Sequence, residues 1–70
     1  MDTISKSSIK LGKQIKKHRK EKGYTQEELA EKLDISRTHM GHIEQGRKSP
    51  SLKLMGKLAK VLKVQLSDLF

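Results

Sequence analysis

A three-residue connection between two short helical segments constrains the fold of this chain more than any other feature. Residues 26–33 and 37–44 both repeat apolar side chains at the three- and four-residue spacing of a helix. Only Asp34, Ile35 and Ser36 separate the two segments. A link this short does not suit long antiparallel arms, and it favours two helices that cross near a right angle. The sequence therefore predicts two short helices packed at a steep angle.

The residues around this connection carry the signals that such a turn needs. Thr25 and Glu28 have the spacing of a capping box for the first helix, and Ser36 is an N-cap for the second. Asp34 has to accept a positive φ, which Gly adopts more readily than Asp. The positions that must be apolar or small hold Leu29, Ala30, Leu33, Ile35, Met40 and Ile43. A random basic chain rarely matches all of them, so we interpret the segment as a helix-turn-helix motif.

The remaining segments complete an all-α fold. The spacing predicts helices over residues 9–22 and 52–62 and a last short turn over 65–70. Their candidate N-caps are, in the same order, Ser7 or Ser8, Ser51 and Ser67. Gly23 ends the first helix, because Gly enters the left-handed region freely. The inward-facing side chains are expected to be Leu11, Ile15, Leu52, Met55, Leu58, Ala59 and Leu62.

These elements predict a compact bundle of four to five short helices. Residues 1–8 are expected to be a flexible N-terminal arm, and residues 9–70 the helix-turn-helix domain. No run of alternating apolar and polar residues predicts a strand.

Charge is distributed along the chain in three blocks. Sixteen Lys and Arg against eight Asp and Glu give a net charge of +8. Residues 1–23 and 46–70 carry +6 and +5, whereas residues 24–45 between them carry −3. A basic balance of this size favours an anionic partner, and nucleic acid is the first candidate. The chain has no cysteine, which excludes a disulfide or a thiolate zinc site, and no apolar run long enough for a membrane span.

Three stretches of the chain resemble one known family. They read LGKQIKKHRKEKG, TQEELAEKLDISRTHMGHIEQGRKSPSL and LAKVLKVQLSDLF, and together they cover about residues 11–70. They resemble the phage Cro-and-repressor (Xre-like) helix-turn-helix domains, whose fold is lambda-repressor-like. The resemblance implies a compact five-helix bundle that binds operator DNA as a dimer. We therefore expect a cytoplasmic, nucleoid-associated regulator of transcription, a dimeric repressor that recognises a palindromic operator.

The second helix of the motif is expected to contact bases in the major groove of double-stranded DNA. Projected at about 100° per residue, the side opposite its apolar residues carries Thr38, Gly41, His42 and Gln45. We predict Arg37, Thr38 and His42 as the base-reading residues. Arg37 suits the O6/N7 edge of guanine and the methyl group of Thr38 suits thymine. His42 suits a base acceptor or a phosphate, and a contact of Arg37 with phosphate alone stays open.

Phosphate contacts are expected around these base-reading residues. The N-termini of both helices of the motif offer free backbone amides, and Gln26 can donate its side-chain amide. The resemblance adds Thr25, Ser36, Gln45, Arg47 and Lys48 to the phosphate-binding residues. Other lysines, namely Lys10, Lys13, Lys17 and Lys53, are expected to add no more than a diffuse positive field.

Two further sets of residues are expected to have structural roles, one within the monomer and one between the two subunits of a dimer. The resemblance implies an ion pair between Arg19 and Glu44, which fixes the recognition helix against the first helix. Its role is structural, because removing one partner of a buried pair costs about 3–5 kcal/mol. A dimer interface is expected at the C-terminal end, where apolar side chains exceed what a small monomer surface requires. These side chains are Leu54, Leu66, Leu69 and Phe70.

Other classes of function remain as alternatives. Glu27 and Glu31 form an acidic face on the first helix of the motif. Resemblance to phage activators implies contact with RNA polymerase there, and a protein-interaction module is the related alternative. Acidic residues in a first helical turn also stabilise the helix dipole without any partner. No set of nucleophile, base and orienting group is apparent, so we expect no enzyme, cofactor or small-molecule ligand. His39 and His42 lie one turn apart but lack a further acidic ligand, so we expect no metal site.

Overall fold

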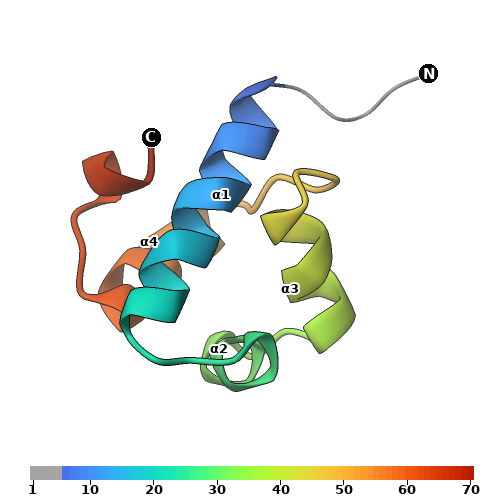
Figure 1. The fold of residues 1–70 in the computed structure, drawn as a ribbon, viewed down its shortest axis with the longest axis vertical. Coiled ribbons are helices and arrows are strands. Elements are labelled where there is room, and N and C mark those ends of the chain that lie inside the picture. The colour runs from blue at the N-terminus through green and yellow to red at the C-terminus, as the bar shows by residue number, and fades with distance from the viewer. Residues whose placement is uncertain (1–5) are drawn as a thin grey trace.

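The structure, a computed structural model, describes residues 6–70 and contains only helices and turns within that range. Its elements are α1 (Lys6–Glu21), α2 (Gln26–Leu33), α3 (Arg37–Glu44), α4 (Leu52–Leu62) and a 3₁₀ helix, η1 (Leu66–Leu69) (Figure 1). The predicted all-α bundle of short helices is confirmed. The bounds of α2, α3 and α4 agree with those expected from the sequence.

Helix α1 begins earlier than its apolar spacing predicted. It starts at Lys6 instead of residue 9, so residues 6–8 are helical and do not belong to an arm. Residues 1–5 of the expected arm lie outside the described residues. Ser7 and Ser8 are inside the helix, so neither is its N-cap. The Ser8 hydroxyl instead forms a hydrogen bond with the Ser49 hydroxyl, at an Oγ–Oγ distance of 2.9 Å.

The turn between α2 and α3 has the predicted chemistry. Thr25 Oγ1 accepts from the Glu28 amide at 3.0 Å, and Glu28 Oε1 accepts from the Thr25 amide at 2.8 Å, which is a complete capping box. Ser36 Oγ accepts from the His39 amide at 3.0 Å. Asp34 takes the left-handed conformation with φ of 59°, as the short connection requires. These local interactions fix the ends of α2 and α3 and the turn between them.

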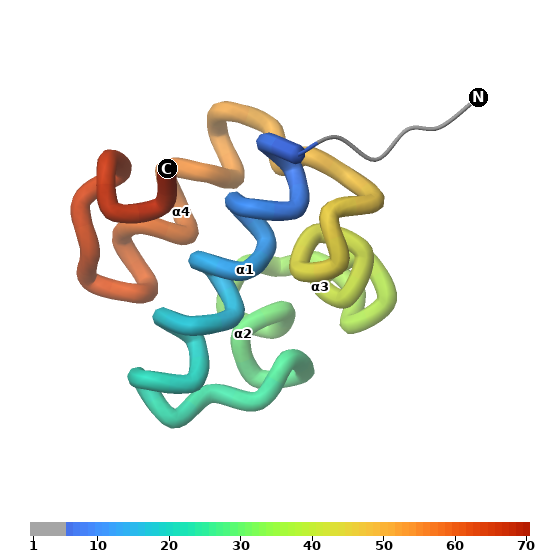
Figure 2. Tube along the Cα trace, turned by 45° about the horizontal axis from the view of Figure 1, so that its top comes forward, coloured from blue at the N-terminus to red at the C-terminus, as the bar shows by residue number. Residues whose placement is uncertain are grey.

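The arrangement of the helices is organised around α1. Both views show α3 on one side of α1 and η1 on the other (Figures 1 and 2). Helix α2 packs against α3 and α4. The fully buried side chains between the helices are Ile15, Leu29, Leu33, Met40, Ile43, Leu58, Leu62 and Leu69. Among residues 6–70, no helix has both the length and the apolar composition that a bilayer crossing needs.

The apolar residues of the C-terminal part differ from expectation at four positions. Leu52, expected to face inward, is 80% exposed, because it lies about 100° round α4 from the centre of the buried side. Ala59 is only half-buried. Leu54 and Leu69, expected at a dimer interface, are 8% and 0% exposed within the single chain. Their surface is therefore used in the chain's own core, and Leu66 and Phe70 are the exposed members of that set.

A glycine in α1 allows a close approach between two helices. A Cβ atom on Gly12 would lie 2.5 Å from the carbonyl oxygen of Glu44 and 2.6 Å from that of Ile43. Helix α1 therefore presents bare backbone to the end of α3. The sequence patterning did not reveal this contact, because a helical glycine carries no apolar signal.

Candidate nucleic-acid interface

One side of α3 is exposed and carries the expected base-reading residues. Arg37, Thr38 and Gln45 are exposed and His42 is half-exposed, whereas Met40 on the opposite side is fully buried. We call the surface formed by Arg37, Thr38, Gly41, His42 and Gln45 the α3 outer face. The structure thus brings the three predicted base-reading residues to one side of the molecule.

A polar hollow lies between the α3 outer face and the start of α2. Its volume is about 240 Å³, and it is lined by Gln26, Arg37, Thr38, Gly41, His42, Gln45 and Arg47. Gly41 forms part of its wall, because a Cβ atom there would meet only Gln26 Oε1, at 3.8 Å. Most of the polar side chains in this hollow are hydrogen-bond donors. Donors in a concave surface suit the acceptor atoms of base edges and phosphates.

A second polar hollow lies at the N-terminus of α2. It has a volume of about 450 Å³ and is lined by Arg19, Thr25, Gln26, Glu27 and Arg37. A helix N-terminus carries a positive partial charge and favours anions. Arg37 lines both hollows, so its guanidinium group has access to either a base edge or a phosphate at this position. The two interpretations of Arg37 are both compatible with the structure.

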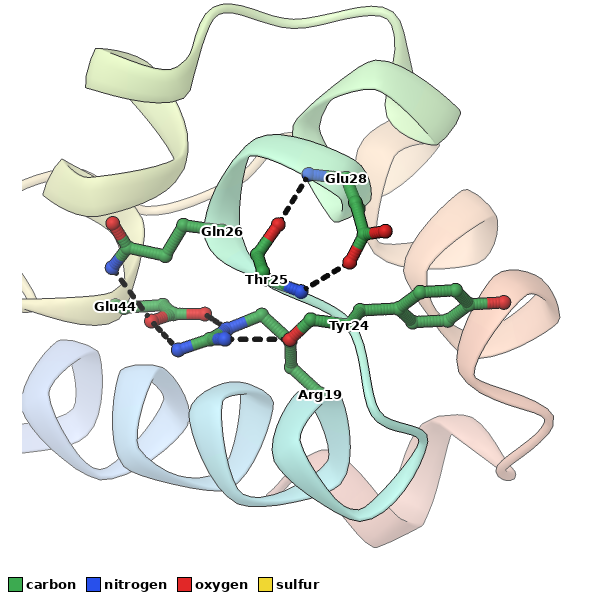
Figure 3. Close-up of polar contacts among 6 residues, drawn as sticks. All are labelled: Arg19, Tyr24, Thr25, Gln26, Glu28 and Glu44. Atoms are coloured by element: carbon green, nitrogen blue, oxygen red, sulfur yellow. Dashed lines mark hydrogen bonds and ion pairs between the residues drawn. The ribbon is translucent and has the colours of Figure 1, made fainter.

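A buried network of polar side chains joins α1, α2 and α3 (Figure 3). Arg19 Nε donates to Glu44 Oε2 at 2.6 Å, and Arg19 Nη2 donates to Glu44 Oε1 at 3.2 Å. Arg19 Nη1 donates to the carbonyl oxygen of Tyr24 at 2.7 Å. Each of the two charged residues is 7% exposed. The bidentate geometry fits a structural ion pair that holds the end of α3 against α1.

Gln26 is the third member of this network, which sequence reasoning did not foresee. Its Nε2 donates to Glu44 Oε1 at 2.9 Å. Because a carboxylate can only accept hydrogen bonds, the amide nitrogen must face Glu44 and the amide oxygen must point away. One Nε2 proton remains for another acceptor. Gln26 can therefore donate to a phosphate, as expected, while Glu44 fixes its orientation.

The two N-capping hydroxyls keep a donor for a ligand. Thr25 Oγ1 and Ser36 Oγ act as acceptors in their caps, and a hydroxyl that accepts still has a proton to donate. Both residues are exposed, as are Arg47 and Lys48 in the loop after α3. The backbone amide of Arg47 donates to the His42 carbonyl at 2.9 Å, which holds this basic loop close to the C-terminal turn of α3.

The acidic residues of α2 lie on the surface. Glu27 and Glu31 are both exposed, whereas Glu28 is engaged in the capping box. Within residues 6–70, no three His, Cys, Asp or Glu side chains gather in a group that could hold a metal ion.

Known proteins share both the sequence pattern and the fold. A family model described as helix-turn-helix matches residues 15–69. An uncharacterized HTH-type transcriptional regulator of Methanothermobacter thermautotrophicus is 46% identical over 57 residues, covering 80% of this chain and 83% of that protein. The immunity repressor protein of Bacillus phage phi105 is 42% identical over 57 residues, covering 81% of this chain and 40% of the repressor.

A solved structure adds the comparison in three dimensions. The crystal structure of SinR, the master regulator for biofilm formation, in complex with DNA matches with a TM-score of 0.78 and 38% sequence identity. The match covers 84% of this chain and 95% of that chain.

Proposed function

The chain belongs to the helix-turn-helix family, and on that premise we propose that it is a sequence-specific, double-stranded DNA-binding regulator of transcription. The resemblance found in the sequence is thereby confirmed at the level of the family. The similarity to SinR, whose structure was solved in complex with DNA, supports duplex DNA as the ligand. A regulator of transcription works where the chromosome is, so we place the protein in the cytoplasm.

The α3 outer face is the observation that carries this proposal. Arg37, Thr38 and His42 lie together on it and enter the major groove, where each base pair presents a distinct pattern of donors and acceptors. The phosphate contacts come from the residues around the two hollows and the loop after α3. They are Thr25, Gln26, Ser36, Gln45, Arg47 and Lys48.

We propose repression as the mode of regulation. The similarity to the immunity repressor of phage phi105 supports this choice. A repressor that occupies a promoter needs no catalytic group, and occupancy alone blocks transcription. The protein acts as a homodimer on a palindromic operator, with its two α3 helices about 34 Å apart.

The dimer forms through the exposed apolar side chains of the C-terminal half. Leu52, Leu66 and Phe70 are 80%, 38% and 66% exposed. A groove of about 320 Å³, lined mainly by apolar atoms of Leu11, Pro50, Leu52, Met55 and Phe70, lies beside them. A standard interface buries about 800 Å² per partner, which is a large share of the 4900 Å² surface of this chain. We therefore expect a weak dimer that is completed on DNA.

Selection from a randomised duplex pool at physiological salt tests the proposal. A palindromic motif with half-sites about one helical turn apart is the expected result. Recovery of no motif by a protein that is folded by circular dichroism would refute sequence-specific binding.

A contact with RNA polymerase is the second candidate role. Glu27 and Glu31 are exposed one helical turn apart on α2, and Glu27 lines the hollow at its N-terminus. A Glu27→Gln/Glu31→Gln double variant that binds the operator but no longer activates a promoter would support this role. Unchanged activation by that variant would exclude it.

A further inference from the structure

Five lysines form a continuous line on the outside of α1. Successive members are four, three, four and three residues apart, which is the spacing that places side chains on one face of a helix. All five are exposed. The line spans about 21 Å, at 1.5 Å of rise per residue. We call this set the α1 lysine stripe: Lys6, Lys10, Lys13, Lys17 and Lys20.

The α1 lysine stripe points away from the rest of the protein. Its centre lies roughly 165° round the helix from the centre of the buried side, which carries Leu11, Gly12, Ile15 and Arg19. Gly12 is the point where α1 touches α3, and η1 packs on another side of α1 (Figure 2). The centre of the stripe lies about 120° round α1 from Gly12, so the stripe faces away from the contact with α3. We therefore expect a short duplex in the major-groove site of α3 to leave the stripe accessible.

Among residues 6–70, no acidic side chain forms an ion pair with a lysine of the stripe. The ion pairs within residues 6–70 join His18 to Glu21 and Arg19 to Glu44, and neither contains a stripe lysine. Glu21 is the only acidic residue of α1. Five positive charges are thus presented along one line, and the one acidic residue of the helix pairs with His18 and not with a stripe lysine.

The composition of the stripe indicates what kind of partner fits it. Protein interfaces are centred on buried aromatic and apolar side chains and are depleted in lysine. A helix that lies on a membrane needs a free apolar face, whereas the apolar face of α1 is buried in the core. Binding to a nucleic-acid backbone needs only positive charges at regular intervals. A duplex carries about one negative charge per 1.7 Å of axis, so a length of about 21 Å presents about a dozen phosphates.

We propose that the α1 lysine stripe is a second, sequence-independent DNA-binding surface, which holds a separate duplex while α3 occupies the operator. The proposal rests on the DNA-binding function proposed above. It gives the protein the capacity to bridge two DNA segments. The contact is made of point charges on flexible stems, so it selects neither a base sequence nor a groove.

A bridging assay tests this proposal. An immobilised operator duplex, no longer than the selected motif, is saturated with protein, and the capture of a labelled duplex of unrelated sequence is measured. A Lys10→Gln/Lys13→Gln/Lys17→Gln variant is compared with the wild-type protein. We expect capture to fall roughly tenfold or more, and the slope of log affinity against log salt for the second duplex to decrease by about 2.7 for three lost phosphate contacts.

A matched variant controls for the loss of charge. Lys53→Gln/Lys57→Gln/Lys60→Gln removes the same charge from exposed positions of α4, and we expect it to capture the second duplex like the wild-type protein. Substitution of Lys10, Lys13 and Lys17 by Arg keeps the charge and should retain capture. Both glutamine variants should melt at the wild-type temperature, which shows that the fold is intact. Any loss of operator affinity from the weaker diffuse field should be the same in both.

Two outcomes would overturn the proposal. The first is that the variant with three glutamines in α1 captures the second duplex as well as the wild-type protein does, or as well as the variant with three glutamines in α4. The other is a loss of binding to labelled polyglutamate without a loss of duplex capture, which would assign the stripe to an acidic protein. If selection yields no operator, the proposed function fails, and the same comparison on an immobilised duplex of arbitrary sequence still decides the role of the stripe.

Discussion

Gly12 of α1 lies directly against the backbone carbonyl of Glu44 at the end of α3. A Cβ atom at Gly12 would be 2.5 Å from that oxygen, closer than real Cβ atoms approach. The same turn of α3 also carries the Glu44 carboxylate that pairs with Arg19. Backbone contact and ion pair therefore act together to set the position of α3 relative to α1.

Substitution of Gly12 by Ala is expected to destabilise the protein. The added methyl group meets backbone atoms, which cannot rotate away, so α1 and α3 must separate. Overpacking of this kind costs about 1–3 kcal/mol, although Ala favours the helix by roughly 1 kcal/mol over Gly. Urea unfolding should show a lower midpoint for this variant.

Gly56→Ala is the matched control for that experiment. Gly56 is also inside a helix, but apart from its own stretch of helix no heavy atom lies within 4 Å of its Cβ position. The substitution should therefore raise the free energy of unfolding by about 0.5–1 kcal/mol. If both alanine variants are stabilised, the close contact between α1 and α3 does not exist in solution.

Outside the apolar core, removal of the Glu44 carboxylate should be among the single substitutions that lower the free energy of unfolding most. Glu44→Ala leaves the buried Arg19 guanidinium without its partner and removes the acceptor of Gln26. The expected loss is about 3–5 kcal/mol, measured by thermal or urea unfolding. An Arg19→Met/Glu44→Leu double variant should lose less, because no buried charge remains. A melting temperature that hardly changes in Glu44→Ala would show that the pair is not buried.

The two interpretations of Arg37 differ in what its removal does to binding. If the guanidinium contacts a guanine, Arg37→Ala should cost about 1–3 kcal/mol and relax selection at one base pair of each half-site. If it contacts a phosphate in the hollow at the start of α2, affinity should fall for all sequences and the salt slope should decrease by about 1. We expect the first result. Selection and salt titration with the variant distinguish the two.

The sequence predicted the motif well because its signals are local. Thr25 with Glu28, Ser36 and Asp34 each act within a few residues of their own position, so spacing alone identified the caps and the turn. The Arg19–Glu44 pair came from the family resemblance, not from spacing. Local chemistry therefore predicted the caps and the turn beside the candidate interface, and the family resemblance predicted the ion pair behind it.

The contacts that the sequence did not predict join residues distant along the chain. Gly12 against Glu44 and Gln26 on Glu44 depend on how whole helices pack, and no local pattern records them. Helical spacing predicts Leu52 in the core, three residues before Met55, although it lies about 100° from the centre of the buried side of α4. Hydrophobicity alone does not distinguish a core residue from an exposed apolar residue at a helix end.

That distinction leads to a prediction about the dimer. Leu52 is 80% exposed and Leu69 is 0% exposed, although both are apolar residues of the C-terminal half. Leu52→Asp should leave the melting temperature of the monomer nearly unchanged, since surface substitutions alter stability by about 0.5 kcal/mol or less, and should weaken binding to a palindromic operator far more than to a single half-site. Leu69→Asp should instead unfold the protein. If Leu52→Asp binds both duplexes like the wild type, the dimer interface lies elsewhere.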